Sequence, residues 1–104
     1  MVFVDELLVW HNAWGPFKKG SCHMSSDVGP EELHAFAKRI GMKRSWYQGG
    51  RHPHYDLTPS KRVLAVKMGA VEVPGRVFVR CNFEARRRDH ERWLSVFMPE
   101  ARYP

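Results

Sequence analysis

The stretch SSDVGPEELHAFAKRIG, residues 25–41, constrains the fold more than any other part of this 104-residue chain. Pro30 suits the first turn of a helix, acidic residues follow it, and Gly41 suits the position just after the last turn. Four apolar side chains recur at i, i+3, i+4 and i+7 and share one helix face: Leu33, Phe36, Ala37 and Ile40. Two residues are candidates for the N-cap: Ser26 and Asp27. We therefore predict a helix over residues 30–40 with one buried face.

A second helix is predicted from Pro59 to about Met68. Thr58 offers a hydroxyl at the N-cap, Pro59 has no N–H to leave unpaired in the first turn, and Gly69 ends the pattern. Strands are predicted where apolar or aromatic residues alternate or run together, over residues 2–10, 43–48 and 70–73. Residues 11–22 contain Gly-Pro and Lys-Lys-Gly and are predicted to form a loop.

The last third of the chain has an ambiguous pattern. Residues 76–82 alternate with period two, as a strand would, but Pro74 also suits the start of a helix there. From Asn82 to about Met98 apolar residues recur at helical spacing. The order of elements predicts a single α/β domain over residues 1–104, with a small sheet of three to four strands and about three helices. Its C-terminal portion, from about residue 76, is expected to be helical and basic.

The net charge of +6 and the pI near 9.8 favour anionic partners. No apolar run reaches the roughly 20 residues that span a bilayer, and the N-terminus lacks the basic start of a signal peptide. We therefore expect a cytoplasmic protein that makes no contact with a membrane. Cys22 and Cys81 have no C-x-x-C spacing, which predicts two reduced thiols rather than a disulfide or a zinc–thiolate site.

Polar residues gather at three places next to predicted elements. Asp5 ends the first apolar segment, His23 and Asp27 precede the first helix, and HPHYD, residues 52–56, precedes the second. In α/β folds, ligands bind beyond the carboxyl ends of strands, where loops lead into helices. If the first three strands were parallel neighbours, these three places would meet at one edge of the sheet.

Four segments resemble the family called domain of unknown function 4031, found in bacteria and phages: VFVDEL, CHMSSD, EELHAFAKRIGMKRSWYQ and HYDLTPSKRVLAVKMGAVEV. The resemblance covers roughly residues 2–74, and residues 77–104 match no part of the pattern. It implies no activity, because none is assigned to the family. It also implies that the recurring polar positions are His23, Asp27, His34, His54, Tyr55 and Asp56. Occurrence in phages suggests a phage accessory protein, for example one that acts against a host defence.

One chemistry open to these residues is metal binding. His23, His54 and Asp56, with Asp5 or Asp27, could bind Zn²⁺, Mn²⁺ or Fe²⁺ through imidazole nitrogens and carboxylate oxygens. In an extended segment His54 and Asp56 point to the same side. Neither H-x₃-H nor D-x-D-x-D spacing accompanies these residues. The pattern therefore requires no cofactor and leaves a divalent metal as an open alternative.

The second chemistry, which we adopt as the prediction, is a site for a phosphate-bearing small molecule such as a nucleotide. Helix N-termini present free N–H groups, and Arg51, Lys61 and the histidines add positive charge. A histidine oriented by Asp5 or Asp56 could act as an acid or base. We expect these residues at the site: Asp5, His23, Asp27, Arg51, His54, Tyr55, Asp56 and Lys61. Whether the ligand is hydrolysed or only bound stays open, as does the simpler alternative that Asp56 and Thr58 merely cap a helix.

The rival hypothesis is a non-catalytic module that binds nucleic acid or an acidic protein. Residues 76–92 contain six arginines against three acidic residues. The candidates for this surface are Arg80, Arg87, Arg88 and Arg92. No helix-turn-helix, RNP or zinc-finger signature accompanies them. Near the C-terminus, Trp93 and Phe97 would either complete the core or form the seam of a homo-oligomer.

Overall fold

The structure is a computed structural model and describes residues 1–9, 13 and 15–88. Within these residues one four-stranded sheet is covered by helices, which confirms the predicted α/β class with three to four strands and about three helices. The strands are β1 (Val2–Val4), β2 (Cys22–Ser26), β3 (Tyr55–Leu57) and β4 (Val71–Glu72). The helices are α1 (Pro30–Arg39), α2 (Pro59–Lys67), α3 (Gly75–Cys81) and α4 (Phe83–Arg88). Two 3₁₀ turns are η1 (Gly15–Phe17) and η2 (Arg44–Trp46).

The sheet has the strand order β3-β2-β1-β4 and is mostly antiparallel. β2 runs antiparallel to both β1 and β3, and only the pairing of β1 with β4 is parallel. The strands predicted from the sequence cover residues 2–10, 43–48 and 70–73. The first and third contain β1 and β4, which do pair in parallel, whereas residues 43–48 form no strand. The chain reverses direction between β1 and β2 and again between β2 and β3.

The structure differs from the prediction in two segments. Cys22 ends a predicted loop and Ser26 is a predicted cap, but residues 22–26 form β2, the central partner of β1 and β3. Residues 43–48 were predicted as a strand, but their backbone closes on itself in η2, where the Tyr47 N–H donates to the Arg44 carbonyl. Only Gln48 pairs with the sheet region, through two 2.9 Å backbone hydrogen bonds with His54. The aromatic residues of this segment pack as side chains and do not extend a strand.

Both predicted helices are present, and the first has the predicted buried face. In α1 the four predicted core residues, from Leu33 to Ile40, are all buried. Its N-cap is Gly29, not Ser26 or Asp27, and the Ser26 hydroxyl instead accepts from the Val28 N–H at 3.0 Å. In α2 the Thr58 hydroxyl accepts from the Lys61 N–H at 3.3 Å, which confirms the predicted cap.

The ambiguity at residues 76–82 is resolved as a helix. α3 begins directly after Pro74, and its Phe78 ring packs edge-on against Phe3 of β1, with the centroids 5.2 Å apart. α4 is the described start of the predicted C-terminal helix, and the Asn82 side chain accepts from the Ala85 N–H at its first turn. The rest of that helix, together with Arg92, Trp93 and Phe97, lies outside the described residues.

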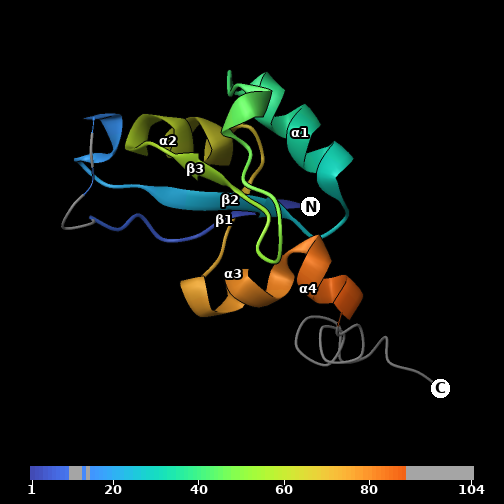
Figure 1. Cartoon of the computed structure of the whole chain (residues 1–104). Coiled ribbons are helices and arrows are strands. Elements are labelled where there is room, and N and C mark those ends of the chain that lie inside the picture. The colour runs from blue at the N-terminus through green and yellow to red at the C-terminus, as the bar shows by residue number, and fades with distance from the viewer. Residues whose placement is uncertain (10–12, 14, 89–104) are drawn as a thin grey trace.

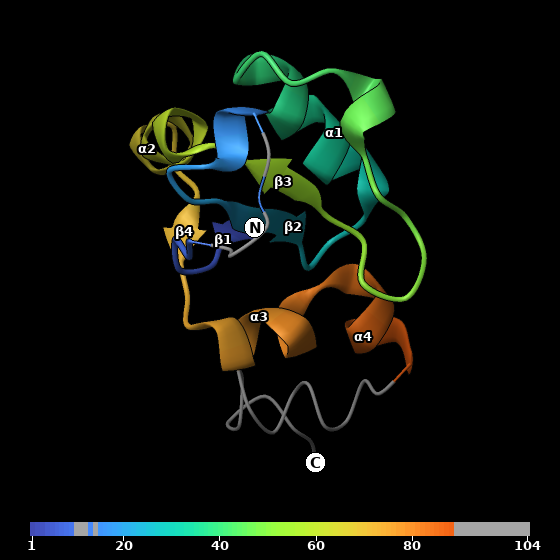
Figure 2. The same ribbon diagram turned by 60° about the vertical axis from the view of Figure 1, so that its left-hand side comes forward.

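The described elements form three layers (Figures 1 and 2). α1 and α2 cover one face of the sheet, and α3 and α4 lie on the other. Val2, Val4 and Met24 point into the larger core beneath α1 and α2, whereas Phe3 points toward Phe78 in α3. Side chains that alternate along the strands therefore serve two different cores. Among the described residues no helix is long and apolar enough to cross a membrane.

Both cysteines are buried free thiols, one in each core. Cys22 belongs to the core beneath α1 and α2, and Cys81 belongs to the core beneath α3. Burial raises the pKa of each thiol to about 12. Neither group is therefore suited to act as a nucleophile or as a metal ligand at neutral pH.

A candidate metal centre at one end of the sheet

Strand pairing brings four predicted site residues together. His23 of β2 lies directly opposite Asp56 of β3, and Asp5 follows β1 beside His23, with its N–H donating to the His23 carbonyl. His54 and Asp56 lie two residues apart and face the same side of the sheet. The alternate residues, Tyr55 and Leu57, point to the other side, into the larger core. The cluster consequently lies on the face of the sheet that α3 covers, where the Phe78 ring centroid is 5.8 Å from that of His23.

The convergence of these residues has a different cause from the one expected. If the strands were all parallel, their carboxyl ends, and the polar residues that follow them, would lie at the same edge of the sheet. In the structure β2 runs opposite to β1 and β3, so the start of β2 lies beside the ends of its two neighbours. His23 stands at that start, whereas Asp5 and Asp56 stand at the two ends. For the same reason Asp27, which follows the other end of β2, is excluded from the cluster.

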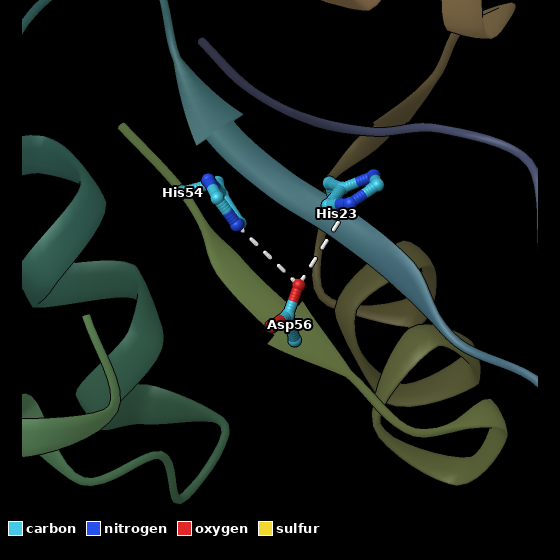
Figure 3. Close-up of side chains that lie close together, drawn as sticks. All are labelled: His23, His54 and Asp56. Carbon is cyan, nitrogen blue, oxygen red and sulfur yellow. Dashed lines mark ion pairs between the residues drawn. The ribbon is translucent and has the colours of Figure 1, made fainter. Parts of the chain in front are cut away.

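The three inner side chains of the cluster are His23, His54 and Asp56, which we call the His₂Asp cluster (Figure 3). The Asp56 Oδ1 atom lies 3.4 Å from His54 Nε2 and 3.8 Å from His23 Nε2. The two imidazole rings are nearly perpendicular, at 82°, with centroids 5.1 Å apart. One potential ligand atom from each residue lies within 4.8 Å of the others, a spacing that a shared metal ion requires.

Each member of the His₂Asp cluster has its other polar atom engaged by a protein group. His23 Nδ1 lies 2.7 Å from Asp5 Oδ2, and His54 Nδ1 lies 2.6 Å from the His52 carbonyl. Since a carbonyl oxygen only accepts, His54 Nδ1 carries the hydrogen, and a carboxylate favours the same tautomer of His23. The Gln48 amide donates to Asp56 Oδ2. The atoms left to face one another are the two Nε2 atoms and Asp56 Oδ1.

Asp5 is itself fixed by its surroundings. Its residue is only 7% exposed, and its Oδ1 atom accepts from the His23 backbone N–H at 2.6 Å. The Arg62 guanidinium donates from Nε to the Asp5 carbonyl at 2.9 Å and from Nη1 to Glu72 at 2.9 Å. A nearly buried carboxylate held in this way fixes the imidazole ring of His23 in one orientation.

The charges within the cluster depend on one another. The hydrogen bond to Asp56 raises the pKa of His54, although burial opposes this, and the His52 carbonyl contributes in the same direction as Asp56. The hydrogen bond from His54 lowers the pKa of Asp56, and the Gln48 amide adds to that effect. Both shifts favour a proton on His54 beside the Asp56 carboxylate, at the position where a cation would bind.

The spacing fits a metal ion after a small closure. With metal–ligand bonds of about 2.1 Å, two ligands of a tetrahedral ion are about 3.4 Å apart. The observed separations of 3.4 and 3.8 Å are close to this value. Two histidines and one carboxylate match the donor set of catalytic zinc sites and of facial non-haem iron sites, both of which leave positions open for a ligand.

The other predicted ligand-binding residues do not join the cluster. Asp27 Oδ1 forms an ion pair with the N-terminal amine at 2.8 Å, the Tyr55 hydroxyl lies 2.7 Å from His34 Nδ1, and Lys61 Nζ donates to the Ile40 carbonyl. Arg51 is an exposed loop residue, and its backbone carbonyl accepts a hydrogen bond from Arg88 Nη1. Lys61 lines a cavity that Asp56 also lines, as described below.

Three residues next to the cluster were not predicted: Gln48, Arg62 and Phe78. Gln48 reaches Asp56 because its backbone pairs with His54, and Arg62 reaches Asp5 from the first turns of α2. Both contacts depend on tertiary placement, and no local pattern in the sequence signals them.

Of the four arginines proposed for nucleic-acid binding, three are described. The Arg87 guanidinium pairs with the Glu84 carboxylate at 2.6 Å, and Arg88 Nη1 donates to the Arg51 carbonyl at 3.3 Å. Arg80 is an exposed residue of α3. Arg92 lies outside the described residues.

Comparison with known proteins places the chain in a family. The family model described as "Protein of unknown function (DUF4031)" matches residues 2–85. The match extends past the predicted limit at residue 74 and includes all of α3 and the start of α4. No curated protein and no solved structure matches the chain. Because the match spans most of the sequence, the chain belongs to the DUF4031 family of proteins of unknown function.

Proposed function

We propose that the His₂Asp cluster binds one divalent transition-metal ion and that the loaded site binds a phosphate-bearing ligand, such as a nucleotide, and hydrolyses it. One observation supports this above the others. The two Nε2 atoms and Asp56 Oδ1 face one another while the second polar atom of each side chain is held by Asp5, the His52 carbonyl or Gln48. Metal-binding histidines are typically oriented by such partners.

A metal ion also accounts for how an anion could bind here. Asp56 and Asp5 bring two carboxylates to the cluster, so a phosphate group alone would meet like charge. Of the cations expected to offset them, Arg51 is an exposed loop residue and the Lys61 ammonium donates one hydrogen bond to the Ile40 carbonyl, so neither pairs with these carboxylates in the structure. A doubly charged ion held by two neutral imidazoles and the Asp56 carboxylate would offset the charge of both carboxylates, so a phosphate would no longer meet like charge and could bind the ion directly.

The hydrolytic step would use the open positions of the site. His23, His54 and Asp56 would hold the ion, which would supply a Lewis acid for a phosphoryl oxygen and would lower the pKa of an attacking water toward 7. The water oxygen forms the new bond to phosphorus, the bond from phosphorus to the leaving oxygen breaks, and that oxygen takes up a proton. Asp5 holds His23 and Gln48 holds Asp56, so these two residues preserve the ligand geometry during the reaction.

The proposal is tested by combining a thermal-shift panel with product analysis. In metal-loaded protein at least one nucleotide should raise the melting temperature, since a ligand that binds only the folded state stabilises it. Chromatography of the same mixture should show a dephosphorylated or cleaved product. Both signals should be lost in His54→Ala and kept in His34→Gln, whose histidine contacts Tyr55 instead of the cluster. A panel in which no nucleotide shifts the melting temperature would contradict the proposal.

A second candidate function is nucleic-acid binding by the arginine-rich helices. The observation in its favour is that the Arg87 side chain is 75% exposed in α4, whose last three described residues are arginines. Duplex DNA would then bind with a steep dependence on salt concentration. Binding should weaken in Arg80→Ala and Arg87→Ala and be unaffected by His54→Ala, the reverse of the result expected for the metal centre.

The setting proposed for either function is the cytoplasm, where the two buried thiols would stay reduced. A phage accessory role is a separate prediction, which is based on the family resemblance. Expression of the chain in a bacterial host, followed by phage challenge with and without the His54→Ala change, would test that role.

A further inference from the structure

A cavity of about 650 Å³ opens beside the His₂Asp cluster, at the edge of the sheet formed by β3. It lies among η1, η2 and the start of α2, and its lining includes Phe17, Met42, Trp46, Gln48, Thr58 and Lys61. Asp56 also lines it. Asp56 therefore belongs both to the cavity wall and to the His₂Asp cluster, and Gln48, which donates to Asp56, also lines the cavity.

The cavity presents an aromatic surface. Trp46 is 47% exposed although it is among the largest apolar side chains of the protein. It is held in η2, and the Lys43 ammonium lies 5.6 Å from the centroid of its ring. Phe17 and Met42 add apolar surface across the cavity. An indole placed in this way is a stacking surface for a planar ring.

Polar groups stand at the margin of this apolar surface. Ser45, Gln48 and Thr58 line the cavity and carry hydroxyl or amide groups that can hydrogen-bond to ring heteroatoms. The Lys61 ammonium is anchored by the Ile40 carbonyl at the end of α1, which leaves its remaining N–H groups to meet an anion. A few polar groups around an apolar pocket within the usual volume range of 300–1,000 Å³ are typical of small-molecule sites.

We infer that this cavity binds the base of a nucleotide, with the ring stacked on Trp46 and the phosphate directed toward the His₂Asp cluster at Asp56. The inference rests on the proposed function for the phosphate end and adds the part of the substrate that gives specificity. A planar ring with heteroatoms at its edge is the occupant that matches both the indole and the polar margin. The positive charge of Lys61 and of a bound metal complements the phosphate.

The first measurement follows the Trp46 indole N–H in ¹H–¹⁵N spectra, with the signal assigned by its loss in Trp46→Phe. Adenosine, guanosine, cytidine and uridine carry no phosphate, so their binding does not depend on the metal centre. At least one should shift the Trp46 signal in the metal-free protein. If no nucleoside moves this signal, or if simple aromatic compounds such as benzoate move it at lower concentration than every nucleoside, the inference is wrong.

The second measurement compares ligands by calorimetry on Zn²⁺-loaded protein. At least one of the four nucleoside 5′-monophosphates should bind about fivefold or more tightly than ribose 5-phosphate, which lacks the base. Trp46→Leu should remove this difference and leave Zn²⁺ binding unchanged. Val63→Ala, which truncates an exposed apolar residue outside the cavity lining, should keep the difference. Equal binding of all four nucleotides and ribose 5-phosphate would overturn the inference.

The two measurements separate the inference from the proposed function. Failure of Zn²⁺ to bind would reject the metal centre, and the nucleoside shifts would still decide whether the cavity accepts a base. Zn²⁺ binding combined with an unmoved Trp46 signal would retain the metal centre and reject the base pocket.

Discussion

Asp5 contacts His23 at two atoms: its Oδ1 accepts from the His23 backbone N–H at 2.6 Å, and its Oδ2 lies 2.7 Å from the His23 Nδ1 atom. The two contacts fix both the strand register and the imidazole ring. Asp5→Asn keeps the size of the side chain but supplies only one acceptor oxygen, so one of the two hydrogen bonds is lost whichever way the amide is turned. We predict a 10- to 100-fold loss of metal affinity, as is usual for such partners.

The loss in Asp5→Asn should be measured by competition with a chelating dye, and unfolding curves of the metal-free variant should show that it is folded. Glu72→Gln is the matched control, since it also exchanges a carboxylate for an amide near Arg62 but does not contact the cluster. Affinity equal to the wild type in Asp5→Asn would show that Asp5 has no role in orienting a ligand.

Metal binding should weaken as the pH falls, and should begin to do so above pH 6.5. His54 must lose its Nε2 proton to bind a cation, and its pKa is raised above the ordinary value of 6.5 by the hydrogen bond to Asp56. Titrations with Zn²⁺ between pH 5.5 and 8 should show the change, and protons should be released on binding. An affinity that is constant through this range would argue against His54 as a ligand.

The stability of the metal-free protein should respond to pH with opposite signs at two histidines. Because the pKa of His54 is raised in the folded protein, this residue contributes fully to the free energy of unfolding below pH 6.5. The contribution is lost as the pH rises through the pKa that His54 has in the folded protein. The pKa of His34 is lowered by burial and by the nearby Arg44, so its contribution is complete above pH 6.5 and is lost as the pH falls below that value.

Urea unfolding curves of chelator-treated protein, measured from pH 5 to pH 8, would separate these two effects. His54→Gln should lose the decline in stability on the alkaline side, and His34→Gln should lose the decline on the acidic side. Each single variant is the control for the other. Identical pH profiles in wild type and His54→Gln would mean that the His54–Asp56 pair does not form in solution.

Both thiols should resist modification until the chain unfolds. Burial raises the pKa of Cys22 and of Cys81 to about 12, so almost no thiolate is present at pH 8. A disulfide-exchange reagent such as DTNB should react slowly with native protein and at once with two thiols per chain in denaturant. Fast labelling of either cysteine in the native state would show that its core opens readily.

The local features of the fold could be predicted from the sequence, but the pairing of its strands could not. The apolar stripe of α1 and the Thr58 cap of α2 depend on residues within one or two turns, and both were confirmed. β2 was missed because Cys22 ends the predicted loop and Ser26 suits a helix cap. In the structure Ser25 is buried, and its hydroxyl donates to the Pro53 carbonyl. That partner lies 28 residues away, so no local pattern indicates it.

The candidate site was predicted in part for the same reason. The alternation in HPHYD correctly put His54 and Asp56 on one side, because that depends only on an extended backbone. Joining His23 to them required the antiparallel register of β2 with β3, which long-range pairing determines. Asp27 follows the opposite end of β2 and Tyr55 points into the core, so both lie apart from the cluster, and the sequence indicates neither placement.

The most direct test of the account is a calorimetric titration of untagged, chelator-stripped protein with Zn²⁺. The His₂Asp cluster predicts one bound ion per chain, complete loss of that binding in Asp56→Asn and His54→Ala, and retention in His34→Gln. Conversion of Asp56 to Asn removes the ligand charge but preserves shape, so loss in this variant would identify the carboxylate as a ligand. Absence of stoichiometric binding by the wild type, or equal binding by the wild type and Asp56→Asn, would contradict the metal centre.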